Sequence, residues 1–312
     1  MLSRQASSLY WIGRYQERTE YITRFIDVKY LSTMDSTIID YQNFVLRSIK
    51  FMVTGNAFAD SKYEPDILWK VSLDKNAPTS IISYVTAVRE NTKGIRNLIS
   101  NELWEIVNKN YHFVHNFSGE YLKTRGLYEF THQVEENASL FQAKLESTLL
   151  HDNAWAFIKL GIYVERAYQI TRILINTLSD IKALKIENEN PTVENHQWVT
   201  TLNVLEALDM TKKLFRKGVS EEVACEFLIT NLDFPRSIAS SLDKCSKTIK
   251  KIKNGTEINQ LDRDSLIYKT AKLSATIKYL DFQNTEIDTN ELLSNTLKEL
   301  AKLNDAIQKE FF

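Results

Sequence analysis

Apolar residues recur along this chain at intervals of three and four positions, the spacing of one face of an α-helix. Between residues 3 and 32 the side chains of Leu9, Ile12, Tyr15, Ile22 and Ile26 fall on one such face. The same pattern predicts further helices over these ranges: 35–54, 67–73, 81–100, 101–116, 126–149, 152–184, 196–216, 220–230, 234–253, 263–281 and 288–311. The alternation typical of a strand does not recur over a useful length. The sequence therefore predicts an all-α protein.

Helix-breaking residues are rare, because the 312 residues include only 8 Gly and 4 Pro. This composition favours long helices over a fold with many turns. The polar stretches 55–66 and 187–195 are the predicted loops. Asn76 and Asp233 each stand two positions before a proline and are predicted to cap the helices that follow, and Asn254-Gly255 is predicted to end one. We expect a single all-helical domain over residues 1–312.

Two sequence patterns occur twice in the same order, which is the signature of an internal repeat. Residues 13–24 and 161–172 share the frame G-x-Y-x-E-R-x-x-x-I-T-R. Residues 76–81 and 233–238 share a cap residue followed by x-Pro-x-Ser-Ile. The chain is therefore predicted to be a multi-helix bundle of two pseudo-symmetric halves, about 1–150 and 151–312, with long central helices.

The repeated residues lie on a narrow stripe of each long helix. The stripe comprises a glycine, a glutamate and an arginine at positions i, i+4 and i+11. These residues are Gly13, Glu17 and Arg24 in the first copy and Gly161, Glu165 and Arg172 in the second. A glycine inside a helix permits close approach of a neighbour. We predict that the two helices cross at the glycines, so that each glutamate meets the arginine of the other copy.

Two roles are open for this Glu-Arg cluster. The favoured interpretation is a structural ion-pair network, because buried ion pairs often define how helices pack. The alternative is an enzyme in which the cluster, with Arg89, binds a carboxylate or phosphate and carries out acid–base chemistry.

Other candidate site residues are not repeated. Arg89, Glu90 and Trp104 belong to the first half alone, as expected of an asymmetric site, although drift after duplication explains the same pattern equally well. Arg236 stands near a predicted helix N-terminus, where an anion would be favoured, and capping or packing is its alternative role. A self-associating module with an aromatic surface of Trp69, Trp104 or Trp198 is a third interpretation of the chain.

Charge and composition exclude several other classes of protein. The net charge of −1 gives the chain no general attraction to nucleic acid or to an anionic membrane. The chain contains no apolar run of about 20 residues and no secretory signal, so we expect a cytoplasmic protein.

The spacing of Cys225 and Cys245 forms no metal or disulfide pattern, so both are predicted to be buried, reduced thiols. His112 and His115 have a spacing that a metal could use, but packing is favoured, and no phosphate-binding glycine loop is present, so no metal or cofactor is predicted.

The chain resembles the bacterial alpha-E family over nearly its whole length. The resemblance is carried by Met1-Leu2-Ser3-Arg4, by residues 9–15 with Glu17-Arg18, and by further segments in the same order: 88–91 with 95–96, 104–105 with Asn108, 157–161 with 165–167, and 226–228 with 234–237. Ile162 and Thr19 depart from the family pattern.

The resemblance implies an all-helical protein found beside, or fused to, circularly permuted ATP-grasp proteins and transglutaminase-like peptidases. The function that it implies is a noncatalytic helical partner of an ATP-grasp amide or peptide ligase, which binds the ligase or its peptide-like substrate. The partners that it implies are an ATP-grasp-type protein and a transglutaminase-like protein.

Overall fold

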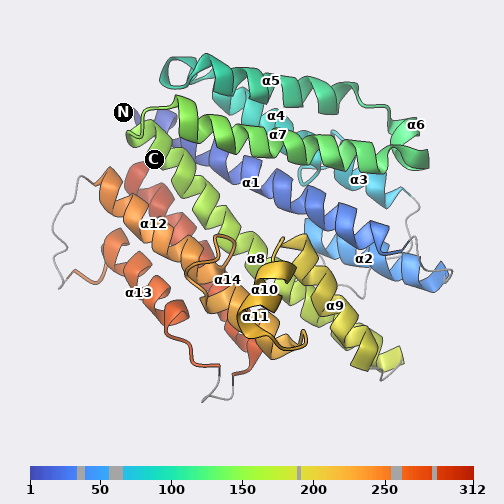
Figure 1. Ribbon diagram of the computed structural model, residues 1–312. Coiled ribbons are helices and arrows are strands. Elements are labelled where there is room, and N and C mark those ends of the chain that lie inside the picture. Colours follow the sequence, from blue (N-terminus) through green and yellow to red (C-terminus); the bar gives the residue numbers. More distant parts are fainter. Residues whose placement is uncertain (34–38, 56–65, 188–190, 254–261, 283–286) are drawn as a thin grey trace. The chain divides into compact units, whose positions relative to one another are not determined.

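The computed structural model describes residues 1–33, 39–55, 66–187, 191–253, 262–282 and 287–312. All regular structure in these ranges is helical (Figure 1), so the predicted all-α class is confirmed. No helix in the described ranges is both long and apolar enough to cross a membrane. The chain divides into two compact units, residues 8–158 and residues 1–7 with 159–312.

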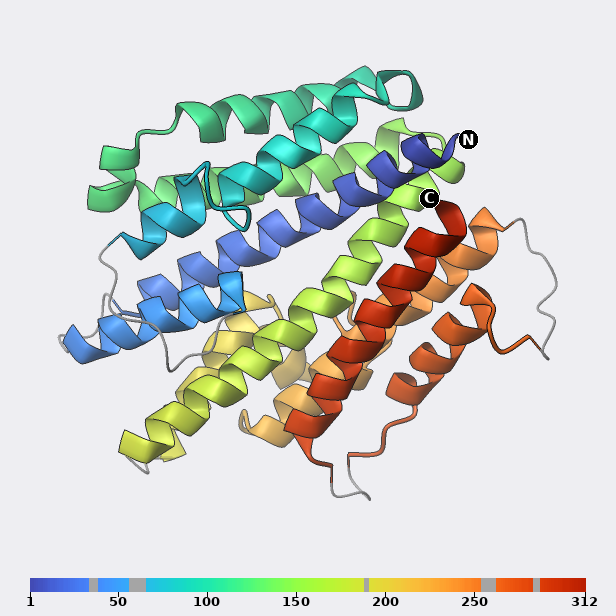
Figure 2. The same cartoon turned by 180° about the vertical axis from the view of Figure 1, so that it is seen from behind.

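The unit of residues 8–158 is built around the long helix α1 and the antiparallel hairpins that follow it in sequence. Its helices are α1 (Ser3–Leu31), α2 (Ile39–Thr54), α3 (Ile67–Leu73), α4 (Ile81–Lys93), α5 (Asn101–Asn116), the single turn α6 (Gly119–Tyr121) and α7 (Leu127–Thr148). Helix α5 packs against both α4 and α7, and α3 packs against α2 and α4 (Figures 1 and 2). Buried aromatic side chains fill the interior: Tyr21, Phe25, Phe130 and Phe141.

The unit that contains residues 159–312 is built from most of the long helix α8 and the helices that follow it. Its helices are α8 (Asn153–Glu187), α9 (Pro191–Val204), α10 (Leu208–Phe215), α11 (Glu221–Thr230), α12 (Ile238–Ile252), α13 (Leu266–Lys278) and α14 (Thr289–Phe311). Helix α12 packs against α11 and α13, and α13 packs against α14 (Figure 2). The core residues include Trp198, Leu228, Ile238 and Leu300, all fully buried.

The turns before α4 and α12 have the same local structure. In each turn a serine caps the helix: Ser80 Oγ accepts from Ser83 N at 3.3 Å, and Ser237 Oγ accepts from Ser240 N at 3.0 Å. Each serine hydroxyl also donates to the carbonyl six residues earlier, that of Asp74 or Asn231. The side chains of these two residues accept a backbone N–H two positions ahead.

The predicted caps Asn76 and Asp233 are therefore wrong. Both residues lie inside the turn, four positions before the caps, and they donate their backbone N–H groups to the turn. A cap must place its side-chain oxygen beside a free N–H of the first helical turn. Only Ser80 and Ser237 stand immediately before the helices and can do so.

Most predicted helices are confirmed, with changes at their ends. The predicted helix 81–100 ends at Lys93 and is followed by a short 3-10 turn, Arg96–Leu98. The predicted helix 196–216 is two helices, α9 and α10, separated at Glu206, whose φ is 52°. Helix α9 begins inside the predicted loop 187–195, because Pro191 needs no N–H partner at a helix start. The predicted end at Asn254-Gly255 lies outside the described residues.

The helices of the two units follow one another in a similar order. In both units a long helix, α1 or α8, comes first and shorter helices follow it. The serine-capped turn then precedes three longer helices, which are α4, α5 and α7 in one unit and α12, α13 and α14 in the other. This order agrees with an internal duplication, which stays a prediction from the repeated sequence.

Candidate functional site

The predicted site residue Glu17 lies in a polar contact between α1 and α7. The Gln142 amide on α7 donates to Glu17 Oε2 at 3.3 Å and to Glu20 Oε2 at 3.2 Å. Glu17 and Glu20 are 1% and 2% exposed. One amide group is thus shared by two buried carboxylates on successive turns of α1.

Arg24 extends this contact along α1. Its guanidinium lies 3.1 Å from Glu20 on the preceding turn and 3.5 Å from Glu135 on α7. One turn further, the Thr131 hydroxyl donates to Asp27 Oδ1 at 2.6 Å. We call these residues the α1–α7 seam: Glu17, Glu20, Arg24, Asp27, Thr131, Glu135 and Gln142. The seam joins two helices through charge-assisted hydrogen bonds.

Burial dominates the electrostatics of the seam. Burial raises the pKa of Asp27 above its usual value, although the Thr131 hydrogen bond and the nearby His132 and Arg24 act in the opposite direction. Arg24 is only 5% exposed. Such an arrangement defines which residues of α1 face α7, because misaligned helices would leave buried charges with fewer partners.

The second copy of the motif on α8 is equally buried. Glu165 is fully buried, and the Gln169 amide donates to its Oε1 at 2.5 Å. Arg172, two turns beyond Glu165, is half-buried. Gly13 and Gly161 are both buried in their own long helices. The predicted crossing at these glycines, and the predicted pairs between the two copies, stay predictions.

The arginine that follows each repeated glutamate contacts the serine-capped segment of its own unit. The Arg18 guanidinium lies 5.3 Å from the ring centroid of Tyr84 on α4. The Arg166 guanidinium donates to the Pro235 carbonyl at 3.4 Å, just before α12. In both units the glutamate of the Glu-Arg pair is therefore buried. The arginine contacts α4 in one unit and the turn just before α12 in the other.

The unrepeated residues Arg89 and Trp104 do meet, on the surface shared by α4 and α5. The Arg89 guanidinium lies 4.2 Å from the Tyr111 ring centroid and 5.7 Å from that of Trp104. Arg96 approaches the Trp104 ring at 4.9 Å, and the His115 ring stacks against Tyr111 at 4.0 Å. We call Arg89, Arg96, Trp104, Tyr111 and His115 the α4–α5 stack.

Local hydrogen bonds hold the stack in place. Arg89 Nε donates to Asn108 Oδ1 at 2.9 Å, and His115 Nε2 lies 2.9 Å from the Thr86 hydroxyl. Tyr111 and Arg96 were not singled out as site residues from the sequence. Tyr111 stands two helical turns after Trp104, and Arg96 stands just after α4. These are weak sequence signals, because the residues come together only when α4 packs on α5.

Two other predicted site residues, Glu90 and Arg236, form ion pairs. Glu90 is exposed at the edge of the stack, where it pairs with Lys93 at 2.8 Å and contacts Arg89 at 3.4 Å. Arg236 pairs with Glu206 at 2.9 Å, just before the Ser237 cap. Both are thus held by ion pairs with charged side chains of their own unit.

Other side chains with possible chemistry have packing roles. Cys225 and Cys245 are buried free thiols, and burial raises the pKa of Cys225 far above its usual range. Trp198 is fully buried, so it cannot form part of the predicted aromatic surface. Within the described ranges, no three His, Cys, Asp or Glu side chains are grouped as metal ligands.

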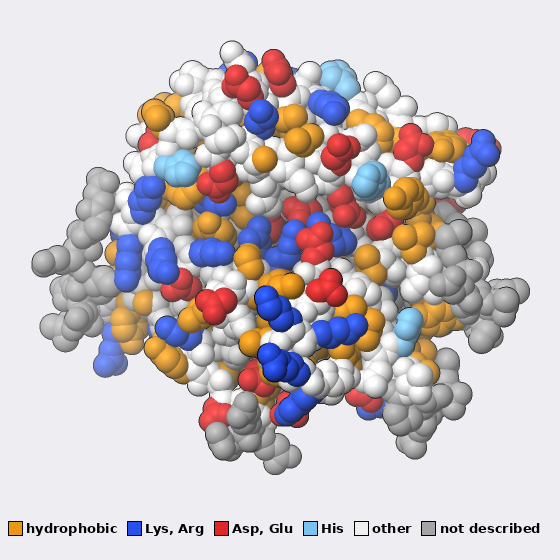
Figure 3. All heavy atoms as spheres, in the orientation of Figure 1, with side chains coloured by type: hydrophobic (Ala, Val, Ile, Leu, Met, Phe, Trp, Pro, Cys, Tyr) orange, Lys and Arg blue, Asp and Glu red, His pale blue; other side chains and the backbone are white. Residues whose placement is uncertain are grey.

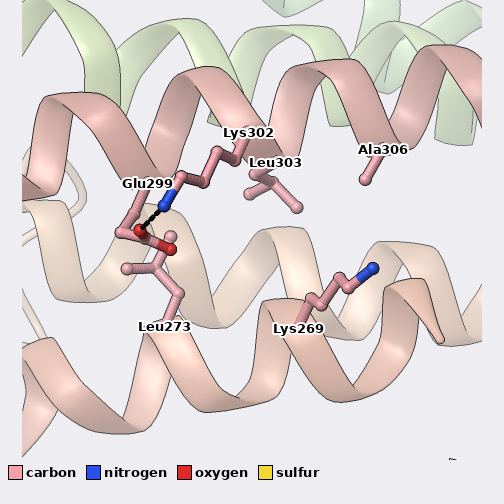
Figure 4. Close-up of a pocket in the computed structure, with 6 residues that line it drawn as sticks. All are labelled: Lys269, Leu273, Glu299, Lys302, Leu303 and Ala306. Atoms are coloured by element: carbon pink, nitrogen blue, oxygen red, sulfur yellow. Dashed lines mark hydrogen bonds and ion pairs between the residues drawn. The ribbon is translucent and has the colours of Figure 1, made fainter. Parts of the chain in front are cut away.

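A groove of ≈ 240 Å³ lies between α13 and α14 (Figure 4). Leu273, Leu303 and Ala306 line its apolar part. The Lys302 ammonium pairs with Glu299 at 2.6 Å across one turn of α14. The groove therefore offers an apolar contact surface. Its polar side chains do not point toward a common centre where a ligand could be held.

Comparison with known proteins gives a family and distant relatives. Uncharacterised proteins of Mycobacterium bovis and of Mycobacterium tuberculosis are each 22% identical to this chain over 281 residues. The match covers 83% of this chain and 31% of each relative, so the chain spans about a third of the length of these curated relatives. No solved structure is significantly similar to the chain.

The family profile matches residues 1–312 and describes a predicted α-helical domain with a conserved ER motif. Two Glu-Arg pairs stand in this chain, at residues 17–18 and 165–166. Both lie in the long helices described above. The whole chain therefore belongs to the Alpha-E family.

Proposed function

We propose that this chain is a noncatalytic helical partner of an ATP-grasp amide or peptide ligase system in the cytoplasm. It binds the ligase or its peptide-like substrate. The observation that carries this proposal is the enclosure of the repeated acid and base residues. Glu17, Arg24 and Glu165 are 5% exposed or less. Glu17 and Arg24 belong to the α1–α7 seam, and Glu165 accepts a hydrogen bond from Gln169 on its own helix. Catalytic groups must instead reach a substrate.

The identity of the partner comes from the family resemblance, which associates such domains with ATP-grasp and transglutaminase-like proteins. The length of the mycobacterial relatives supports a modular role, because the matched region is 31% of each of those chains. A domain carried within a longer chain acts at a high effective concentration beside its neighbours. A family member on a separate chain would reach the same proximity to its neighbours by binding to them.

The α4–α5 stack is the binding surface that we assign to this role. Arginine, tryptophan and tyrosine contribute most of the binding energy in typical protein interfaces. Arg89, Trp104 and Tyr111 are half-buried, so they are held rigidly while part of each side chain stays accessible. Their guanidinium and ring faces suit a partner surface that carries carboxylates and flat amide groups.

The test is co-purification of the full chain with the ATP-grasp protein encoded in the same genome. Wild type and Tyr279→Ala, a change at an aromatic side chain that is 74% exposed in the other unit, are expected to retain the partner. Trp104→Ala is expected to lose most of it. Absence of any ATP-grasp protein from the wild-type complex, or equal retention by all three chains, contradicts the proposal.

A second measurement separates this role from the enzyme alternative. Glu17→Gln and Glu165→Gln keep the size of the side chains but remove their charge. If both variants fold and the pathway still yields its product, the acid–base residues are scaffold. Loss of product by a folded variant that still binds the ligase would support the enzyme alternative.

A further inference from the structure

Helix α10 exposes two large apolar side chains. Met210 and Leu214 stand one turn apart on this helix and are 46% and 56% exposed. A neighbouring face of α10 is packed within the unit, since Thr211 is buried and the Phe215 ring lies 6.3 Å from the Phe227 ring of α11, centroid to centroid. The packing of α10 therefore uses one face of the helix and leaves Met210 and Leu214 in contact with solvent.

Four cationic side chains flank Leu214 in the sequence: Lys212, Lys213, Arg216 and Lys217, all of them exposed. Figure 3 shows Lys and Arg side chains beside apolar ones over the region of α10. Within the described ranges, none of these four side chains forms an ion pair or a side-chain hydrogen bond. The net charge of −1 for the whole chain hides this local excess of positive charge. We call these residues the α10 patch: Met210, Lys212, Lys213, Leu214, Arg216 and Lys217.

The C-terminus of α10 explains only part of this arrangement. Its partial negative charge stabilises cations in the last helical turn, which accounts for Lys212 and Lys213. Arg216 stands beyond that turn in a left-handed conformation, with a φ of 51°, and Lys217 follows it. The helix terminus gives no reason for two exposed apolar side chains among the cations. A partner that is anionic at its surface and apolar beneath would suit both kinds of side chain.

The composition of the α10 patch favours a lipid bilayer over another protein. Lysine is depleted at protein interfaces, and a stable interface buries about 800 Å² and roughly 20–30 residues on each side. A helix of eight residues with two exposed apolar side chains offers a much smaller surface. An exposed ion pair with a protein changes affinity by less than about five-fold, whereas an anionic bilayer gains about five-fold for each Lys or Arg at its surface.

We propose that the α10 patch is a peripheral binding site for the surface of an anionic lipid bilayer. Met210 and Leu214 enter the boundary between headgroups and acyl chains, while the flexible lysine side chains keep their ammonium groups at the level of the lipid phosphates. Binding is reversible, because two partly exposed side chains bury little apolar surface. The α4–α5 stack lies in the other unit, so this site does not depend on the proposed ligase partner.

Co-sedimentation with lipid vesicles tests the proposal on the full chain. Vesicles of phosphatidylcholine with about one-third phosphatidylglycerol carry negative charge, and pure phosphatidylcholine vesicles are the neutral comparison. We expect the wild type to bind the anionic vesicles at least about ten-fold more tightly than the neutral ones. Sodium chloride at about 0.5 M is expected to remove most of this preference, because it screens exposed charges.

Two double variants separate the α10 patch from the overall charge of the chain. Lys213→Gln with Lys217→Gln is expected to bind anionic vesicles roughly twenty-fold more weakly, because each lysine contributes about five-fold. Lys272→Gln with Lys298→Gln is the matched control, since it removes two exposed lysines of the same unit, on α13 and α14, and changes the net charge equally. The control is expected to bind within about two-fold of the wild type.

Leu214→Gln tests the apolar part of the α10 patch. The glutamine has a similar size but resists transfer out of water, so binding to anionic vesicles is expected to weaken about five-fold. Leu150→Gln is the control, because Leu150 is 82% exposed in the other unit. It is expected to bind as the wild type does.

Equal binding of the wild type to both kinds of vesicle overturns the proposal, and so does an equal loss in the two double variants. Unchanged binding by Leu214→Gln overturns the insertion of the apolar side chains. If the chain binds polyglutamate through the α10 patch but does not bind vesicles, the patch is a docking site for an acidic protein segment and the proposal is overturned.

Circular dichroism verifies that each variant folds. If the double variant at Lys213 and Lys217 does not fold, Lys217→Gln alone takes its place, because Lys217 lies beyond the end of α10. This single change is expected to weaken binding to anionic vesicles about five-fold, and unchanged binding overturns the proposal.

Discussion

The guanidinium of Arg89 lies against the ring of Tyr111, 4.2 Å from its centroid, across the α4–α5 contact. The same guanidinium donates to Asn108 on α5. Arg89 therefore joins α4 to α5 by both a cation–π contact and a hydrogen bond. Its side chain is 17% exposed, so solvent screens part of its charge.

Arg89→Ala is expected to lower the free energy of unfolding by about 1 kcal/mol, because it removes the cation–π contact and the packing of the aliphatic stem. Urea denaturation measures this loss. Lys109→Ala, an exposed cation on α5, is the control and is expected to change stability by less than about 0.5 kcal/mol. Equal effects of the two changes would show that Arg89 does not couple the helices.

Gln142→Leu tests the α1–α7 seam. The leucine has a similar size but cannot donate to Glu17 and Glu20. We expect a loss of about 1–3 kcal/mol, because two buried carboxylates lose a shared hydrogen bond. Gln133→Leu on the same helix removes only a bond to the exposed Glu136 and is expected to be nearly neutral. Both losses are measured by chemical denaturation. A larger loss of stability in Gln133→Leu than in Gln142→Leu contradicts the role of Gln142 in the α1–α7 seam.

The pH dependence of stability should report on His115. Burial lowers the pKa of His115 below 6.5, and the positive charges of Lys75, Arg89 and His112 add to this shift. The folded protein thus favours neutral His115, so its contribution is present above pH 6.5 and is lost as pH falls through the lowered pKa.

His115→Phe keeps a ring against Tyr111 but cannot take up a proton. We expect this variant to lose less stability than wild type between about pH 7 and pH 5, measured as urea midpoints across that range. At pH 8, where wild-type His115 is neutral, the difference includes the lost Thr86 contact and the changed packing against Tyr111, and neither of these varies with the protonation of His115. Parallel pH profiles of the two proteins would rule out this contribution.

The two serine caps provide a test of local equivalence between the units. Ser80→Ala and Ser237→Ala each remove a cap and a hydroxyl bond to a carbonyl six residues earlier. Each is expected to cost about 1–2 kcal/mol in thermal or urea unfolding. Ser147→Ala, at an exposed position in the last turn of α7, is the control and is expected to be neutral or slightly stabilising. Losses that differ widely between the two caps would argue against equivalent turns.

The sequence predicted the helices and the buried face of α1 because helical periodicity is a local property. Leu9, Ile12, Ile22 and Ile26 are each 1% exposed or less, as their spacing indicates. Tyr15, predicted on the same face, is half-buried. The helix starts were less accurate. Proline two residues after Asn76 and Asp233 resembles a helix start, but the serine immediately before each helix has the free N–H within its reach.

The site residues were only partly predictable. Arg89 and Trp104 were singled out because they lack a repeated counterpart, and α5 does bring them together. Trp198 was placed on a surface because tryptophan composition says nothing of burial, whereas the packing of its unit buries it fully. The contact of Lys244 with the ring of Tyr163 was not predicted, because the two residues lie far apart in the sequence and no spacing rule joins them.

The sequence by itself determined the all-helical class, the extent of the long helices and the face on which Glu17 and Arg24 lie. These features depend on residues within a few turns of one another. Only the tertiary structure decided that Gln142 bridges Glu17 and Glu20, that Arg89 lies over the ring of Tyr111, and that Lys244 approaches the ring of Tyr163. Such contacts depend on how helices distant in sequence pack, and packing is decided by the fit of many side chains at once.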